Sequence, residues 1–223
     1  MDEQRKTIGR AILSVGGFFL LLAAAMFLPA GTRWTRGWLF LAVFFVEMAL
    51  MALYLWRTNP AILAARSKIQ AGTKGWDRPL FYILQILILA IFPVAAMDHA
   101  PAPTGVVVLG YLLLSVGMAG NAWVLSVNKF AEMTVRIQAE RSHHVVDRGP
   151  YAIVRHPMYV AFFPVAAGMP LALGSYWALI PAAIAAALLV VRTVLEDRML
   201  QRELAGYKEY AGRIRYRLIP GVW

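Results

Sequence analysis

Two polar stretches of the chain hold most of the residues that could do chemistry. They run from residue 128 to 159 and from 192 to 220. In the second stretch, Arg192 and Glu196 are four residues apart, a spacing that puts both side chains on one face of a helix. A guanidinium can bind a carboxylate through two hydrogen bonds, and a carboxylate can accept a proton. The pair is therefore a candidate site, although the same spacing also suits an ordinary ion pair on a helix surface.

The first stretch combines a turn signal with histidines. Residues 147–151 read DRGPY, and Gly149 would let the backbone approach a ligand closely. His143 and His144 stand beside this turn, in a polar loop where solvated histidines are common. The chain has no cysteine and no H-E-x-x-H pattern, so no metal site is predicted. It also lacks a G-x-G-x-x-G motif, which argues against the nucleotide-binding folds of soluble proteins.

The elements that would position these residues are apolar helices. Hydrophobic residues make up 60% of the 223 residues and charged ones 15%, against about 45–50% and 25% in soluble domains. A helix needs about 20 apolar residues to cross a bilayer. Five runs with at most one charge are long enough for this: 11–30, 38–56, 79–97, 100–128 and 157–191.

The last of these runs is too long for one membrane helix. Its 35 residues would span roughly 52 Å as a helix, against a hydrocarbon core of about 30 Å. Pro170, Gly174 and Ser175 stand near its middle, so we predict two helices, 157–173 and 176–197, joined by a tight turn. The fold class is then all-α, a polytopic bundle of about six membrane segments whose last two form a hairpin. A hairpin brings residues 155–157 and 192–197 together at one membrane surface.

The basic residues predict the orientation. All of the 22 Lys and Arg residues except Arg33 and Arg36 fall on one side of this topology, which places both termini in the cytosol. The basic residues that set the membrane topology and attract anionic lipid heads then account for the net charge of +10. No nucleic-acid partner is therefore expected. The first apolar run exceeds the 7–15 residues of a signal peptide's apolar region, so we interpret it as the first span. After the second span, residues 58–68 indicate a short interfacial helix with Asn59 as cap and Pro60 at its first position.

The order and spacing of several motifs in residues 120–223 resemble one family of membrane enzymes. The matching pieces are His143-x-Val-Val-x-x-Gly-Pro-Tyr151, Arg155-His-Pro-x-Tyr159, the pair Glu196-Asp197, and Tyr207-x-x-Tyr210 followed by Arg213 and Pro220. This set is similar to the isoprenylcysteine carboxyl methyltransferase and phospholipid methyltransferase group. The chain would be a single membrane domain in which residues 1–104 carry no family motif and 105–223 form the methyltransferase-like core.

The resemblance implies an integral membrane enzyme that uses S-adenosylmethionine. It places the cofactor in a pocket on the cytosolic side, lined by Gln138, His143, Val145, Val146, Gly149, Tyr151, Arg155, His156 and Tyr159. It places Arg192, Glu196 and Asp197 at the methyl acceptor, with Glu196 fixing the Arg192 guanidinium. The acceptor would be a lipophilic molecule that arrives through the membrane. It would be a carboxylate, which needs an orienting cation, or an amine, which needs a base, and the sequence leaves this choice and the oligomeric state open.

Two positions depart from the family pattern. The family usually has glycine where this chain has Ala161, which would crowd a close helix contact. The second acidic residue of its pair is usually glutamate, whereas here it is Asp197, one methylene shorter. If the Asp197 carboxylate is the functional one, it reaches less far toward the methyl acceptor. Glu196 then becomes the better candidate for the functional carboxylate.

Two other functions remain possible from the sequence. Membrane reductases of the steroid reductase type share a similar C-terminal layout and use NADPH, but they usually show Asn before the motif tyrosine and Gly-Glu after it. Here Met158 and Val160-Ala161 occupy those places. A non-catalytic membrane protein with a decayed motif is the other alternative.

Glu47 is a charge at the centre of the second predicted span, where charges are costly and usually face the protein interior. Gln85 or Asn121 could satisfy it. Glu47 is either a structural carboxyl group or a polar group in the tunnel through which the methyl acceptor reaches the site.

Overall fold

The computed structural model describes residues 2–100 and 102–223, with side chains from residue 16 onward. Within these ranges the chain is helical and has no strand. The α-helices are α1 (Asp2–Ala30), α2 (Thr35–Thr58), α3 (Pro60–Ala65), α4 (Asp77–Ala96), α5 (Thr104–Val127), α6 (Pro157–Ala172), α7 (Leu179–Glu203) and α8 (Tyr207–Arg213). Two short 3₁₀ turns, η1 (Ala139–Arg141) and η2 (Gly149–Ala152), lie between α5 and α6.

Each of the six predicted membrane segments coincides with a helix. Among the described residues, α2, α4, α5 and α7 are long and apolar enough to cross a membrane. Helix α6 and the apolar part of α1, Gly16–Ala30, are shorter. The all-helical membrane architecture is therefore confirmed, while the count of six spans and the orientation of the termini stay predictions. The predicted break between the last two helices is present, with Gly174 in the left-handed region at φ +78°.

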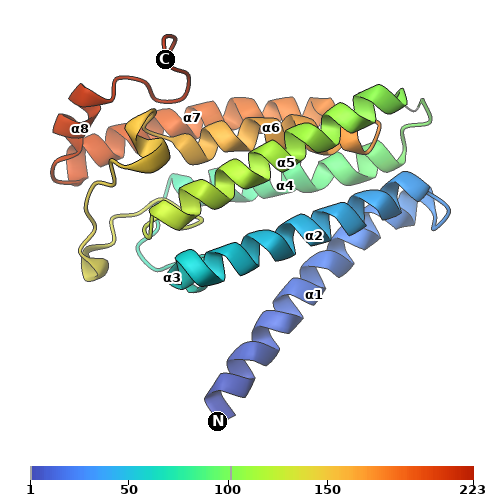
Figure 1. Ribbon diagram of the computed structural model, residues 1–223, viewed down its shortest axis with the longest axis horizontal. Coiled ribbons are helices and arrows are strands. Elements are labelled where there is room, and N and C mark those ends of the chain that lie inside the picture. Colours follow the sequence, from blue (N-terminus) through green and yellow to red (C-terminus); the bar gives the residue numbers. More distant parts are fainter. Residues whose placement is uncertain (1, 101) are drawn as a thin grey trace.

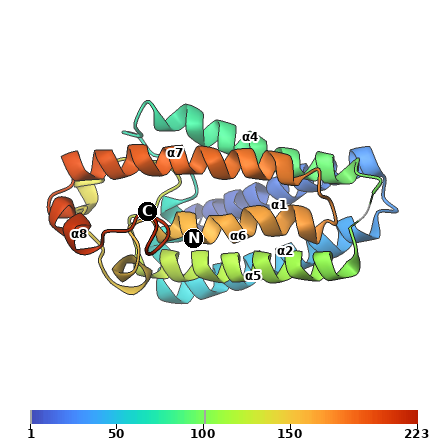
Figure 2. The same cartoon turned by 90° about the horizontal axis from the view of Figure 1, so that it is seen from above.

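The connections of the bundle gather at its two ends (Figures 1 and 2). The turns that follow α1, α4 and α6 lie at one end. Helices α3 and α8, the 3₁₀ turns and the C-terminal segment lie at the other, which we call the site end. The two polar stretches identified in the sequence are therefore side by side in space.

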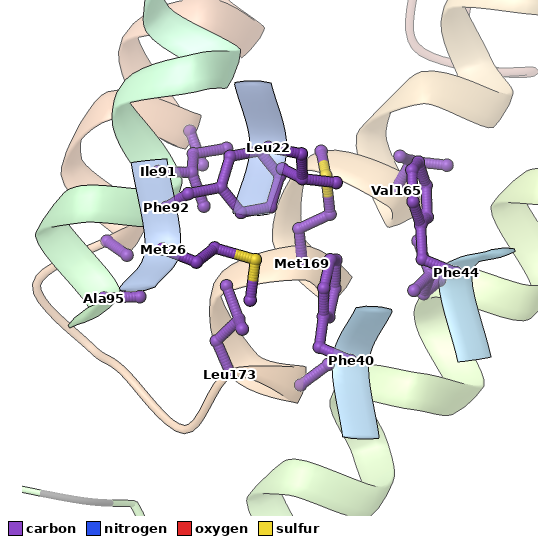
Figure 3. Packing of buried hydrophobic residues seen from close by; sticks show 14 residues of the cluster. Leu22, Met26, Phe40, Phe44, Ile91, Phe92, Ala95, Val165, Met169 and Leu173 are labelled. Atoms are coloured by element: carbon purple, nitrogen blue, oxygen red, sulfur yellow. The ribbon is translucent and has the colours of Figure 1, made fainter. Parts of the chain in front are cut away.

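The largest apolar cluster joins α1, α2, α4, α5, α6 and α7 (Figure 3). Met26 of α1, Phe40 of α2 and Ile91 of α4 are fully buried in it, together with Met169 of α6. Packing of this kind holds helices together in lipid, where burial from water contributes little. The cluster fixes the frame on which the site end is built.

Helices α5 and α6 approach each other most closely, because small residues line their contact. A Cβ atom added at Gly117 would lie 2.8 Å from the carbonyl oxygen of Ala161, and one at Gly168 would lie 2.6 Å from the backbone nitrogen of Leu114. The predicted crowding by Ala161 is resolved by Gly120, whose missing Cβ would stand 3.1 Å from the Ala161 Cβ. Glycine on α5 thus leaves space for the alanine on α6.

The short helix after α2 is present as α3, with Pro60 at its first turn as predicted. Asn59 is the N-cap residue as predicted, but its side chain makes no capping hydrogen bond. Its Nδ2 instead donates to the carbonyl oxygen of Leu125 at 2.7 Å, which ties the start of α3 to the last turns of α5.

Candidate functional site

The two ends of the α6–α7 hairpin meet, as the sequence predicted. Arg155 Nε donates to Asp197 Oδ1 at 2.8 Å and Nη2 donates to Oδ2 at 3.2 Å. Asp197 is completely buried and lies at the centre of a polar cluster. Its carboxylate is also contacted by His156, Gln201, Tyr207 and Arg217.

The C-terminal segment holds the start of α6 in place. The backbone N–H groups of Arg155 and His156 donate to the carbonyl oxygens of Tyr216 and Arg217, each at 3.0 Å. Arg155 Nη1 donates to the carbonyl oxygen of Ile214 at 2.9 Å. The orientation of Arg155 and His156 is therefore fixed by their main-chain hydrogen bonds and by the contacts of the Arg155 guanidinium with Asp197 and Ile214.

A cavity opens beside this cluster at the site end. Together with the open solvent at its mouth, it encloses about 800 Å³ of space. Of the residues that the sequence assigned to cofactor and acceptor, ten line it: Gln138, His143, Val145, Val146, Tyr151, Arg155, His156, Tyr159, Arg192 and Glu196. The folding of the chain therefore brings together residues spread over about 60 positions of sequence.

Two predicted site residues do not line the cavity. Gly149 adopts φ +59° in the turn before η2, and a Cβ atom there would lie 3.2 Å from Val127 on α5. Its position serves turn geometry and packing against α5, and its assignment to the cofactor stays a prediction. Asp197 is also absent from the cavity wall, because all its contacts are to the surrounding donors.

His143 forms part of an aromatic corner of the cavity. Its ring centroid lies 4.5 Å from that of Phe130, and its Nδ1 accepts a hydrogen bond from the backbone N–H of Gln138 at 3.3 Å. Burial lowers the pKa of His143 to about 4, with a further contribution from neighbouring cationic groups. The imidazole is therefore neutral at pH 7, with Nδ1 as acceptor and Nε2–H as donor.

Gln138 supports this corner from behind. Its side chain is almost fully buried, and its Nε2 donates to the carbonyl oxygen of Phe130 at 2.7 Å. Its Oε1 accepts from Arg141 Nη1 at 2.8 Å. Both hydrogen-bonding ends of the Gln138 amide are thus used to hold the loop, and its remaining surface faces the cavity.

Tyr159 connects the two predicted halves of the site. Its ring is parallel to that of His156, with centroids 5.7 Å apart and an interplanar angle of 2°. Its hydroxyl donates to the Glu196 carboxylate. The Arg192 guanidinium lies over the same ring, 5.8 Å from its centroid. Tyr159 of α6 therefore contacts two residues of α7, Glu196 through its hydroxyl and Arg192 through its ring face.

The predicted pairing of Arg192 with Glu196 is wrong. Arg192 binds Asp77 at the start of α4, with Nε–Oδ1 and Nη2–Oδ2 distances of 2.7 and 3.0 Å, and Nη2 also donates to the Met133 carbonyl oxygen. Asp77 Oδ2 accepts in addition from the backbone N–H of Val135. Sequence reasoning missed Asp77, since an acidic residue in the first turn of a helix is usually explained by the helix dipole alone.

A second ion pair in the cavity wall was also missed. Glu132 is buried and accepts from Arg136 through two hydrogen bonds of 2.7 and 2.9 Å. Their spacing of four residues was the available signal, but the segment is not helical. Tyr151, Tyr207 and Tyr210 add phenol rings to the wall, and burial raises the pKa of each.

Glu47 is satisfied by a different residue from those predicted. Ser115 of α5 donates to Glu47 Oε1, whereas Asn121 donates to the Gly117 carbonyl oxygen. The other carboxylate oxygen is buried without a hydrogen-bond partner. Within the described part of the chain, no group of three or more His, Asp or Glu side chains could hold a metal ion.

The fold and the site together define a class. Apolar helices long enough to cross a membrane carry, at one end, a polar cavity walled by tyrosines, histidines and buried ion pairs, as expected of an integral membrane enzyme. Residues 104–202 match the model of the isoprenylcysteine carboxyl methyltransferase (ICMT) family. The match covers 99 of the 223 residues and confirms the resemblance to this family. The comparison with curated proteins gave no match.

Proposed function

We propose that the protein is an S-adenosylmethionine-dependent methyltransferase that acts on a lipophilic acceptor from the membrane. The observation that carries the proposal is the cavity at the base of the α6–α7 hairpin, which gathers eight of the nine predicted cofactor residues together with Arg192 and Glu196. By the distribution of basic residues, this end of the bundle faces the cytosol, from which a soluble cofactor would arrive.

The donor set fits this cofactor. A sulfonium is stabilised over aromatic faces, and Tyr151, Tyr159 and Tyr207 supply such faces in the cavity. The corner formed by Phe130 and neutral His143 suits an aromatic base, with Nε2–H available as donor. When bound, S-adenosylmethionine supplies an electrophilic methyl group. The residues named here would hold it and exclude water.

The chain's own residues then have distinct tasks. Methyl transfer is an in-line displacement, so alignment of the two reactants contributes most of the rate. Arg192, fixed by Asp77, would orient the acceptor, and Glu196, held by the Tyr159 hydroxyl, would face the same point. Asp197 acts as a positioning residue, because it fixes Arg155 and His156 without facing the cavity.

The proposal is tested by calorimetry of the purified protein with S-adenosylhomocysteine. The wild type is expected to bind, and His156→Ala and Tyr159→Ala to bind at least tenfold more weakly. His99→Ala, an exposed histidine at the opposite end of the bundle, is the matched control and should bind like the wild type. No binding by the wild type, or binding of NADPH in its place, would overturn the proposal. So would undiminished binding by both cavity variants.

A further inference from the structure

A second hollow at the site end lies beside the cavity described above. It is an open groove that, together with the solvent at its mouth, encloses about 980 Å³ of space. Its wall includes Thr58 and Val127, the last residues of α2 and α5, together with Lys129 and the loop residues 144–148. We call it the basic groove, because Lys129 and Arg148 line it. Neither of these two side chains has a part in the methyl transfer proposed above.

The basic groove carries an excess of positive charge. Its lining contains two permanent cations, Lys129 and Arg148, and one carboxylate, Asp147. Asp147 is already bound, because Arg213 Nη2 donates to its Oδ2 at 2.9 Å. Within residues 16–100 and 102–223, no Asp or Glu oxygen lies within 4.0 Å of the Lys129 amine or the Arg148 guanidinium. An anion that enters the groove therefore meets two cations that lack an acidic partner.

The hydroxyl groups of the basic groove are occupied within the protein. The Thr58 hydroxyl donates to the Tyr54 carbonyl oxygen at 2.9 Å. The Ser126 hydroxyl donates to the Trp123 carbonyl oxygen at 2.8 Å. Each hydroxyl has a single hydrogen, so neither can donate to a ligand at the same time. Recognition of an anion is therefore left to the two cations.

The basic groove lies at the height expected of lipid head groups. It is found where two long apolar helices, α2 and α5, end at the site end of the bundle (Figure 1). Trp56 on α2 and Trp123 on α5 are exposed within four residues of these ends. Exposed tryptophans near the ends of membrane helices mark the membrane–water interface, and basic pockets on the cytosolic side bind anionic lipid heads. A membrane lipid therefore fits this position better than a soluble anion.

We propose that the basic groove binds the phosphate head of an anionic phospholipid, with Lys129 and Arg148 as the residues that contact it. A phosphodiester accepts charge-assisted hydrogen bonds from an ammonium and from a guanidinium. The acyl chains would remain in the bilayer, beside the exposed tryptophans. This lipid is distinct from the methyl acceptor, because Arg192 and Glu196 line the cofactor cavity and not the groove.

The basic groove and the cofactor cavity share a wall. Residues 144–146 line both. Lys129 Nζ lies 5.0 Å from the centroid of the Phe130 ring, which forms the aromatic corner of the cavity with His143. In the described part of the chain, no backbone N–H of residues 144–148 donates to another backbone group, so few hydrogen bonds hold this wall. A lipid that orders the wall should therefore tighten cofactor binding. This consequence rests on the proposed function, whereas the lipid site does not.

Lipid binding is measured by calorimetry of the full chain in dodecylmaltoside micelles. The probes are dihexanoylphosphatidylglycerol, which is anionic, and dihexanoylphosphatidylcholine, whose head has no net charge. The wild type should bind the first roughly tenfold more tightly, and Lys129→Gln/Arg148→Gln should lose this preference. Arg57→Gln/Lys68→Gln is the matched control, because it removes two exposed cations at the same end that do not line the groove. The control should keep the preference.

A second variant separates loss of charge from loss of fold. Lys129→Arg/Arg148→Lys retains both charges and should retain the preference for phosphatidylglycerol. Three results would overturn the proposal: a wild type without this preference, an equal loss of it in the groove and control variants, or its loss in the charge-retaining variant. Inorganic phosphate that competes with phosphatidylglycerol at equal concentration would also overturn it, because the groove would then be a site for free phosphate.

The consequence for the cofactor is measured in phosphatidylcholine nanodiscs with and without phosphatidylglycerol. S-adenosylhomocysteine should bind the wild type about fivefold more tightly when phosphatidylglycerol is present. Lys129→Gln/Arg148→Gln should show no such gain. Equal affinity of the wild type in both membranes would refute the coupling while leaving the lipid site intact. Absence of S-adenosylhomocysteine binding in both membranes would count against the proposed function, and the calorimetry with lipids would still decide the lipid site.

Discussion

Arg192 of α7 and Asp77 of α4 form a buried, two-point ion pair, although 115 residues separate them in sequence. Asp77 is completely buried, and its second oxygen also accepts from the Val135 N–H in the loop that forms the cavity wall. One carboxylate thus ties together α4, α7 and the cavity wall. Helix α4 lies outside the family match, so the site depends on both halves of the chain.

Replacing Asp77 by asparagine should destabilise the fold and impair the site. The change leaves the Arg192 guanidinium buried without its counter-ion, which typically costs about 3–5 kcal/mol. Thermal unfolding in detergent should show this loss. Glu209→Gln, an exposed position on α8, is the control. If the pair is coupled, Asp77→Asn combined with Arg192→Gln will be less destabilised than the sum of the single variants. Simple additivity would contradict the coupling.

Restoring the family's usual glutamate at position 197 should harm this protein. The Asp197 carboxylate is fully buried and is contacted by Arg155, His156, Gln201 and Arg217. Because Asp197 has no exposed surface, an added methylene should displace these partners, and overpacking typically costs about 1–3 kcal/mol. Unfolding temperature and S-adenosylhomocysteine affinity should both fall in Asp197→Glu. A variant as stable as the wild type, with faster methyl transfer, would show instead that Asp197 is the shortened catalytic carboxylate.

The close contact of α5 and α6 predicts a sharp difference between two glycines of one helix. In Gly117→Ala the new Cβ would lie 2.8 Å from the backbone nitrogen of Val165, so the helices must separate. In Gly105→Ala nothing lies within 4 Å, and alanine favours the helix. We expect Gly117→Ala to lose about 1–3 kcal/mol of stability, measured by thermal unfolding, and Gly105→Ala to lose none. Equal behaviour of the two variants would refute this packing.

The buried imidazole of His143 predicts a pH dependence of stability. Its pKa is lowered to about 4 in the fold, against about 6.5 in an unfolded chain. The unfolded state therefore binds a proton first as the pH falls. The contribution of His143 to stability is complete above about pH 6.5 and is lost progressively down to about pH 4.

The measurement compares unfolding temperatures at pH 7.5 and pH 4.5. His143→Gln removes the titrating group, so its unfolding temperature should fall less over this interval than that of the wild type. Identical pH dependence in the two proteins would show that His143 is protonated in the fold, or that its environment is the same in both states.

The sequence by itself determined the helical membrane architecture, the hairpin of α6 and α7, and ten of the residues that line the cavity. These features follow from local composition. Long apolar runs must form helices in lipid, and Gly174 interrupts the last run near its middle. A hairpin then returns the chain to the same end, so Arg155 and Asp197 had to be near each other, as their 2.8 Å contact confirms.

Only the tertiary structure decided which charges pair. The spacing of Arg192 and Glu196 favoured a local ion pair, but helix packing presented Asp77 to Arg192 and the Tyr159 hydroxyl to Glu196. The rotation and depth of one helix against another depend on small residues such as Gly117 and Gly168, whose partners lie on a distant segment. Partners separated by more than a hundred residues leave no mark in a local pattern, so the sequence could name the charged groups but not the contacts between them.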